Sequence, residues 1–168
     1  MTVVAAIEHE GAAYVACDSS ITAEDARETS AEPKWWIHHG VLVAYAGDLR
    51  AAMIARDAHR RQRAPSVDAL SYVERLHERT RKAFKRERID NDAVDLLVAL
   101  RGRVYVVSGG TVTRSEYGYC AIGGGAEYAL GSLATSSGDP VERVRAAVVA
   151  AIRHSASCGE PVRTEVVR

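Results

Sequence analysis

The order of the predicted elements indicates an α+β fold in which helices cover antiparallel sheets. Two hairpins come first, followed by two helices, a run of strands, two more helices and a final strand. Strands and helices are thus grouped along the chain, whereas a doubly wound fold would alternate them. The 168 residues, 47% of them hydrophobic, suffice for one domain with a proper core. We therefore expect a single domain over residues 1–168.

Short turns mark the first two hairpins. Gly11 supplies the permissive backbone of the first turn, and His38-His39-Gly40 forms the second. The four strands are expected within residues 2–8, 12–18, 34–37 and 41–47. The segment 21–33 between the hairpins is polar and rich in turn residues, so we expect a loop or a loosely paired segment there.

Apolar residues recur at helical spacing after the second hairpin. Asp48 is the expected N-cap of the first helix, and Pro65 stops it. The apolar positions of this helix are Leu49, Met53, Ile54 and Ala58. A second helix is expected over residues 66–88, with Ser66 as its N-cap. Its inner stripe consists of Val67, Leu70, Val73, Leu76, Thr80 and Phe84.

The second half of the chain returns to strands before the last helices. Strands are expected within residues 93–100, 104–109, 111–116 and 119–125, the last of which ends in three glycines. Two helices follow, over residues 126–136 and 140–155. Asp139 and Pro140 are typical of an N-cap and a first helical turn. Residues 162–167 fit an edge strand.

Composition and charge exclude several classes of function. The 22 basic and 22 acidic residues give a net charge of zero, so no global field favours nucleic acid or an anionic membrane. The seven basic residues from Arg75 to Arg88 are interleaved with glutamates, which favours a solvated helix face over nucleic-acid binding. No apolar run is long enough to span a bilayer, and no secretory signal is expected at the N-terminus. Cys17, Cys120 and Cys158 are scattered, which is typical of reduced thiols, so we expect a cytoplasmic location.

Thr2 is the residue that carries the most chemical information. Once the initiator Met1 is removed, Thr2 has both a nucleophilic hydroxyl and a free α-amine, whose ordinary pKa of about 8 suits it to accept the proton. The small side chain at position 2 also favours removal of the methionine. In most proteins, however, a threonine at this position merely begins a strand. Thr2 becomes informative only together with the rest of the chain.

Several segments together resemble the N-terminal nucleophile hydrolases, and more narrowly the β-type proteasome subunits and the bacterial HslV peptidase. In that family an acidic residue follows the first threonine after sixteen positions and a lysine after thirty-two, and Thr2, Asp18 and Lys34 keep these separations. Further family segments match residues 43–48, 121–129 and 153–159 in order. The resemblance covers essentially the whole chain and implies the four-layer αββα sandwich of the family.

The resemblance implies that Thr2 hydrolyses peptide bonds. Its Oγ attacks a peptide carbonyl to form an ester intermediate, and the α-amine accepts the proton, directly or through water. Lys34 supplies positive charge that favours the alkoxide and lowers the pKa of the amine, and Asp18 holds Lys34 in place. Without the resemblance, Lys34 is equally compatible with a solvated lysine, and Asp18 with a residue of a turn.

The same resemblance assigns supporting groups to other segments. The family has a glycine at the position of Ala44, whose backbone N–H is expected to bind the oxyanion. Ser157 aligns with a serine that supports the amine and its water. Tyr45 and the residues around Thr22 are candidates for lining the substrate pocket.

Two departures from the family and one cation site concern the later segments. Gly124 stands where the family has a serine that helps proton transfer, and His154 stands where true proteasomes have an acid. HslV also lacks that acid, which favours the bacterial branch or a divergent one. No cofactor is expected to be required. A structural monovalent or divalent cation is expected at three backbone carbonyls, those of Ala151, His154 and Ser157.

The sequence thus predicts a threonine-type peptidase subunit of a proteasome-like homo-oligomeric ring or stack of rings. Such a chamber would act on unfolded polypeptides delivered by an ATP-dependent unfoldase, and we expect neither a nucleic acid nor a membrane as partner. Two alternatives remain open at this point. One is a catalytically silent structural ring protein, motivated by Gly124 and by the need to remove Met1. The other is a stand-alone amidase of the same fold that acts on small substrates.

Overall fold

The computed structural model describes residues 2–23, 26–66 and 68–168, and within these ranges the side chains of residues 22, 23, 26 and 27 are left aside. Met1, the side chain of Thr22 and Val67, which entered the sequence predictions, therefore lie outside the described part. Within that part no helix is both long and apolar enough to cross a membrane.

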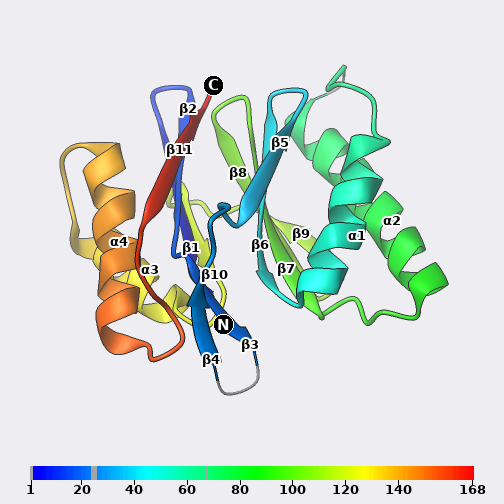
Figure 1. The fold of residues 1–168 in the computed structure, drawn as a ribbon. Helices are drawn as coiled ribbons and strands as arrows, with labels where there is room; N and C mark the ends of the chain where they lie inside the picture. Colours follow the sequence, from blue (N-terminus) through cyan, green and yellow to red (C-terminus); the bar gives the residue numbers. More distant parts are fainter. Residues whose placement is uncertain (1, 24–25, 67) are drawn as a thin grey trace.

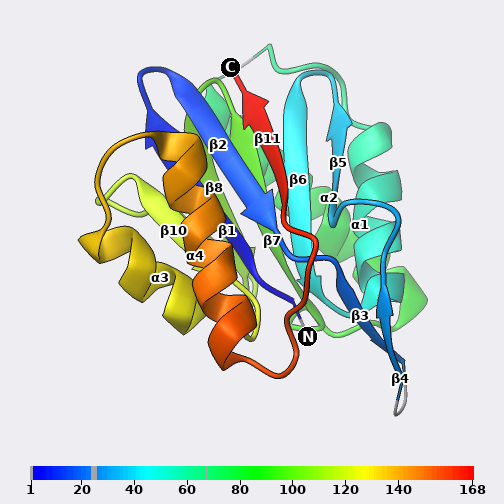
Figure 2. The same ribbon diagram turned by 60° about the vertical axis from the view of Figure 1, so that its left-hand side comes forward.

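Two antiparallel sheets form the centre of the molecule (Figure 1). The four-stranded sheet has the order β10-β1-β2-β11, and its strands are β1 (Val4–His9), β2 (Ala12–Cys17), β10 (Tyr119–Ile122) and β11 (Arg163–Val167). The five-stranded sheet has the order β5-β6-β7-β8-β9, and its strands are β5 (Trp35–His38), β6 (Val41–Gly47), β7 (Val94–Leu100), β8 (Arg103–Ser108) and β9 (Thr111–Thr113). All predicted strands are present, and β11 lies at an edge as expected (Figure 2).

The segment between the first two hairpins is more ordered than a loop. Strands β3 (Ser20–Ala23) and β4 (Ala26–Thr29) pair as a separate two-stranded ribbon, which projects from one end of the sandwich in Figures 1 and 2. Of the two descriptions expected for this segment, the loosely paired one is therefore closer. The chain leaving the ribbon is fixed to β11, because Arg163 donates to the backbone carbonyls of Ser30 and Ala31.

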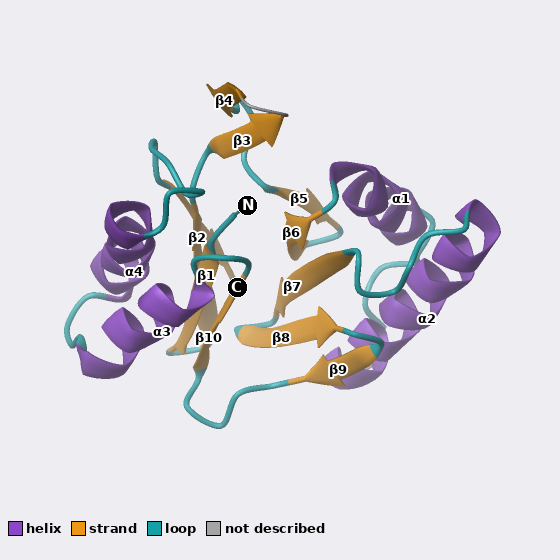
Figure 3. Cartoon of the chain, turned by 90° about the horizontal axis from the view of Figure 1, so that it is seen from below, coloured by secondary structure: helices purple, strands orange, loops and turns teal. Residues whose placement is uncertain are grey.

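Two pairs of helices cover the outer faces of the sheets. Helices α1 (Leu49–Arg60) and α2 (Ala69–Glu87) pack on the five-stranded sheet, and α3 (Ala126–Thr135) and α4 (Pro140–His154) pack on the four-stranded sheet. Figure 3 shows the resulting order of helices, sheet, sheet and helices. The predicted α+β class and the four-layer αββα sandwich are confirmed.

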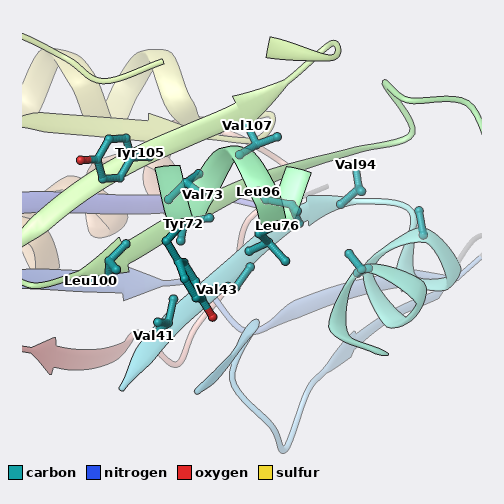
Figure 4. Packing of buried hydrophobic residues seen from close by; sticks show 14 of the residues in the cluster. Val41, Val43, Tyr72, Val73, Leu76, Val94, Leu96, Leu100, Tyr105 and Val107 are labelled. Atoms are coloured by element: carbon teal, nitrogen blue, oxygen red, sulfur yellow. The ribbon is translucent and has the colours of Figure 1, made fainter. Parts of the chain in front are cut away.

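The buried apolar residues form one cluster between the sheets and one under each pair of helices. β7 illustrates how alternation along a strand supplies two of them. Leu96 and Val98 face α1 and α2, in the cluster drawn in Figure 4, whereas Leu97 and Ala99 face the other sheet. The two sheets are thus held face to face by small and branched side chains, and the site described below lies at one end of this inter-sheet layer.

Two predictions about the helices are wrong in detail. Leu49 and Met53 are exposed, at 48% and 38%, because α1 turns the alanines of its other face against the sheet. The buried residues of this helix are Ala51, Ala52, Ala55, Ala58 and His59. The N-cap of α2 is Asp68, not Ser66, and its carboxylate accepts the N–H of Ser71 at 3.0 Å. Asp48 and Asp139 cap α1 and α4 as predicted.

The stripe predicted for α2 is otherwise mostly buried. Val73, Leu76, Thr80 and Phe84 pack inward, whereas Leu70 is 45% exposed. With its N-cap at Asp68, the helix has Leu70 in its first turn, before the first residue of the buried face, Tyr72.

Candidate active site

Thr2 lies immediately before β1 and is fixed there by the glycine-rich segment that follows β10. Only 8% of the residue is exposed, and its carbonyl accepts the N–H of Gly125 at 3.4 Å. Gly123 has a φ of +90°, and a Cβ on it would lie 2.2 Å from the carbonyl oxygen of Thr2. A side chain cannot fit at that distance, so the glycine allows the two backbones to approach each other.

Lys34 reaches Thr2 from the other sheet. It precedes β5, is 3% exposed, and its Nζ donates to Thr2 Oγ1 at 2.8 Å and to Asp18 Oδ1 at 2.7 Å. An ammonium group held at this distance places a positive charge directly on the threonine hydroxyl. The short distance to Asp18 provides the opposite charge that a buried lysine requires.

Asp18 follows β2 and is completely buried. Besides Lys34, its Oδ1 accepts the backbone N–H of Val3 at 3.1 Å. Its Oδ2 accepts the backbone N–H groups of Ser20 and Gly159, each at 3.1 Å. These donors satisfy a buried carboxylate and at the same time fix its orientation toward Lys34. The three residues brought together by sequence spacing therefore form one buried, hydrogen-bonded group.

Ser157 lies in the same late loop but has a different partner. Its Oγ is 2.8 Å from the Oγ of Ser155, and within the described residues no hydrogen bond joins it to Thr2, Asp18 or Lys34. It is Gly159, two residues further on, that contacts Asp18. His154 also points elsewhere, because its ring lies against Tyr128 with the centroids 5.6 Å apart.

Ala44 lies in the middle of β6, away from Thr2. It pairs with Trp35 of β5 and Leu97 of β7, and it is fully buried in the cluster between the sheets. The N–H of Tyr45 donates to the carbonyl of Lys34, directly before β5, so alternation along the strand turns the N–H of Ala44 toward β7. The same alternation turns the N–H of Gly47, at the end of β6, toward the side of β5 and Lys34. Gly47 is thus the residue of β6 with a suitable backbone donor near the site.

Gly47 also has the backbone freedom that this position requires. Its φ is +128°, and a Cβ on it would lie 2.5 Å from the carbonyl oxygen of Ala93. The sequence signal that could have identified it is the pair Gly47-Asp48, a glycine directly before a helix N-cap.

A cavity of about 220 Å³ opens beside Thr2. Its other lining residues come from the end of β6, the start of β7 and the glycine-rich segment, and they are Ala46, Gly47, Asp92, Ala93, Asp95, Gly123 and Gly124. Gly124, which replaces the family serine, therefore lines this cavity without contributing a hydroxyl. Tyr45 does not line it, because its side chain packs beside Trp36 on the face of β6 that meets α1 and α2.

The carbonyls expected to hold a cation lie at the C-terminal end of α4 and in the loop that follows. The Ala151 carbonyl accepts the N–H of Ser155 at 2.8 Å, as the last turn of a helix requires. Carbonyl groups left over at a helix end carry partial negative charge, which suits a cation. This arrangement is compatible with the expected cation, whose binding stays a prediction.

Cys17 is adjacent to Asp18 and is completely buried. Burial raises the pKa of its thiol to about 11, although the charge and backbone of Lys34 act in the opposite direction. A thiol with this pKa is protonated near neutral pH and is a poor nucleophile. The hydroxyl of Thr2, in contrast, directly contacts the ammonium group of Lys34.

No protein-family model matches the chain, and no curated protein matches it. Solved structures do. BPH of Thiobacillus denitrificans superposes with a TM-score of 0.86 at 21% identity, with 99% of this chain and 98% of that chain covered. This chain has the proteasome-type N-terminal nucleophile hydrolase fold.

Two further structures with this proteasome-type fold match almost as well. HslV of Trypanosoma brucei has a TM-score of 0.79 at 19% identity, with 98% of each chain covered. Anbu, the ancestral β-subunit, of Yersinia bercovieri has a TM-score of 0.78 at 19% identity, with 99% of this chain and 82% of that chain covered. At these identities the similarity establishes the fold, and the chemistry must be argued from the site itself.

Proposed function

We propose that the chain is a threonine-type peptidase subunit whose nucleophile is Thr2, once Met1 has been removed. The observation that carries this proposal is the hydrogen bond from Lys34 Nζ to Thr2 Oγ1 at 2.8 Å, inside a buried group that Asp18 completes. A threonine that only began a strand would not require a buried lysine on its hydroxyl, since burial of an ammonium group is costly.

The reaction proceeds in two steps with Thr2 as both nucleophile and base. Its Oγ1 attacks the scissile carbonyl while its freed α-amine takes the hydroxyl proton. The tetrahedral intermediate collapses, the C–N bond breaks, and the proton passes from the α-ammonium to the leaving amine. Water then attacks the resulting ester by the same route, which releases the acid and regenerates Thr2.

Lys34 and Asp18 act by charge and orientation. The ammonium group of Lys34 stabilises the developing alkoxide on Thr2, and because Lys34 and Asp18 are buried this effect is stronger than at the surface. Asp18 holds that ammonium group in place through its Oδ1. We assign the oxyanion donor to the N–H of Gly47 in place of that of Ala44, because of the direction in which β6 presents the two groups.

Ser157 is assigned a lesser role near the α-amine. It belongs to the loop from which Gly159 contacts Asp18, so it lies in the right segment, but its hydroxyl is paired with Ser155. With a glycine at position 124, no side-chain hydroxyl at this position assists the transfer of the proton to the α-amine of Thr2.

We further propose that the subunit assembles into a homo-oligomeric ring or stack of rings that admits unfolded polypeptide, with an ATP-dependent unfoldase as partner. The support is the similarity in fold to HslV and to Anbu, of which the Pseudomonas aeruginosa form is described as a helical assembly. A cation at the carbonyls of Ala151, His154 and Ser157 would brace the loop that carries Gly159.

The proposal is tested first by the mass of the N-terminus of the purified protein, which must show that Met1 is absent. A chromogenic peptide is then expected to be cleaved by the wild type and by Ser157→Ala, but not by Thr2→Ala. BPH has been solved in complex with epoxomicin, and we expect this epoxyketone to modify Thr2 of the wild type. A protein with retained Met1 and no cleavage would instead be a structural ring protein.

The same assay separates a peptidase from a small-substrate amidase. A peptidase in a chamber is expected to cleave unfolded polypeptides many residues long, and an amidase only short amides. Cleavage of acyl anilides together with complete resistance of an unfolded polypeptide would contradict the ring peptidase and favour the amidase.

A further inference from the structure

The ionisable side chains that line the cavity beside Thr2 are all acidic. Its described lining contains two ionisable side chains, Asp92 and Asp95, and no lysine or arginine. The structure pairs neither carboxylate with a cation among the described residues. The nearest wall opposite them consists of glycine and alanine. A group that enters this space meets, besides the α-amine of Thr2 and the Asp18-bound ammonium of Lys34, two carboxylates that form no ion pair among the described residues.

Asp95 occupies a position in β7 where an apolar side chain would be expected. Along β7 the residues that face the other sheet are Asp95, Leu97 and Ala99, and the latter two belong to the buried layer between the sheets. Asp95 pairs with Ala46 across the strands, which fixes it at the end of that layer, where the cavity begins. A half-buried carboxylate at the end of an apolar stripe loses hydration without gaining a protein partner. A cationic group from a substrate would supply that partner.

The size of the cavity limits what can occupy it. Its volume of about 220 Å³ is below the roughly 300–1,000 Å³ that is usual for pockets that hold a whole small ligand. A single long side chain fits such a space, provided that the rest of the molecule remains outside. Since the cavity is lined by Thr2 itself, that side chain must belong to a residue close to the bond under attack.

We propose that this cavity is a specificity subsite for a lysine or arginine side chain of the polypeptide substrate, with Asp95 and Asp92 as the residues that recognise its charge. This inference rests on the proposed function and names the class of substrate that the site prefers. Gly47 and Gly123 leave the cavity open toward Thr2, so the cationic side chain and the scissile carbonyl are bound at the same time.

The experiment uses unstructured fluorogenic peptides that are identical except at one position, which carries lysine, glutamine or glutamate. The position is moved residue by residue across the cleaved bond, which is located by mass spectrometry. At one position close to that bond the lysine peptide is expected to exceed the glutamine peptide in kcat/KM by about tenfold and the glutamate peptide by more. The preference is expected to shrink as salt is added, because Asp92 is exposed and Asp95 is only partly buried.

Substitution of the two carboxylates tests their assignment. Asp95→Asn and Asp92→Asn are each expected to reduce the ratio of lysine to glutamine cleavage several-fold, and the double variant to bring it close to one. Asp90→Asn is the matched control. It lies in the same loop and loses the same charge, but it lines a different surface with Glu78, Lys82 and Lys85. Its ratio is expected to equal that of the wild type.

A ratio near one at every position of the wild-type scan, or an unchanged ratio in the double variant, would overturn the subsite. So would an equal loss of rate on all three peptides in Asp95→Asn, which would indicate a general role. The inert Thr2→Ala variant separates the two proposals. If no wild-type cleavage occurs but Thr2→Ala still binds the lysine peptide more tightly than the glutamate peptide in fluorescence anisotropy, the subsite stands and the peptidase fails.

Discussion

At the scale of single residues, the site consists of two buried charged side chains, Asp18 and Lys34, and the hydroxyl of Thr2, to which Lys34 donates. Asp18 and Lys34 are both buried, so each makes the other tolerable there. Two well-packed apolar residues in their place would make the protein at least as stable. The buried pair is therefore better explained by the effect of the Lys34 charge on the hydroxyl of Thr2 than by a contribution to stability.

Asp18→Asn is expected to abolish peptide cleavage and to lower the free energy of unfolding by about 3–5 kcal/mol, because Lys34 is left buried without its counter-charge. Denaturation by urea and initial rates measure the two effects. Asp18→Asn combined with Lys34→Met is expected to regain much of the stability and none of the activity.

The exposed pair Glu78 and Lys82 is the control for that measurement. Lys82→Met is expected to change the free energy of unfolding by less than about 1 kcal/mol. Activity in the Asp18→Asn, Lys34→Met double variant would show that the two buried charges serve folding alone.

Gly123→Ala is expected to eliminate activity, because the new Cβ would lie 2.2 Å from the carbonyl oxygen of Thr2 and must displace it. It should also lower the free energy of unfolding by about 1–3 kcal/mol, since φ is +90° at this residue. Gly131→Ala in α3 is the matched control, for a Cβ there meets nothing within 4 Å. This variant is expected to be fully active and about 0.5–1 kcal/mol more stable. Full activity of Gly123→Ala would contradict the placement of Thr2.

The three central residues were predicted from the resemblance, because Thr2, Asp18 and Lys34 keep the separations of the family. Hydrophobic alternation alone places each of them beside a strand end and leaves their roles open. The sequence was not sufficient for the oxyanion donor. The choice between Ala44 and Gly47 depends on which neighbour each N–H of β6 faces, and that is a property of pairing with β5 and β7. Asp95 could have been noticed, since it interrupts an otherwise apolar strand.

At the scale of the elements, α1 is joined to β5 by a polar contact inside the apolar layer. Trp36 Nε1 donates to His59 Nδ1 at 2.8 Å, so the proton of the imidazole is on Nε2, which lies 3.1 Å from the hydroxyl of Tyr72. His59 is completely buried. Helix α1 presents four alanines and His59 to the sheet, so its sequence shows little apolar periodicity. This is why the face predicted for α1 was wrong.

This contact predicts a loss of stability in acid. Burial, together with the neighbouring His38 and His39, lowers the pKa of His59 to about 4 from an ordinary 6.5. Above pH 6.5 the ring is neutral in both folded and unfolded chains. As the pH falls toward 4 only the unfolded chain takes up the proton, so the free energy of unfolding falls by about 3 kcal/mol.

His59→Gln keeps a donor and an acceptor but does not titrate. Between pH 7 and 4 the stability of this variant, measured by urea denaturation, is expected to fall less steeply than that of the wild type. Equal slopes would contradict the assignment of the acid sensitivity to His59.

The N-caps illustrate how far the elements could be predicted. Asp48 and Asp139 each stand directly before the first residue of their helix and were identified correctly. Before α2 the sequence offers both Ser66 and Asp68, and local propensity does not rank them. The ribbon β3–β4 was harder still, since its stability depends on contacts such as that of Arg163 with the chain after β4, which come from the other end of the sequence.

At the scale of the whole molecule, the αββα order could be inferred from the grouping of strands and helices and from the resemblance, and it is what the structure has. The association of subunits is not contained in one chain. We expect the protein in solution to form a particle several times the 18.2 kDa of the single chain. Light scattering coupled to size-exclusion chromatography measures this mass, and a fully active monomer would contradict the ring.

The hydrogen bond from the N–H of Gly159 to Asp18 has a consequence for the time at which the nucleophile becomes active. Strands β1 and β2 and Lys34 are made early, but the carboxylate that orients Lys34 receives one of its donors from a residue close to the end of the chain. During synthesis the ribosome therefore releases a segment that holds the reactive hydroxyl without its finished support. The orientation of Asp18, and with it that of Lys34, is therefore completed only after Gly159 has been synthesised and β11 has paired with β2.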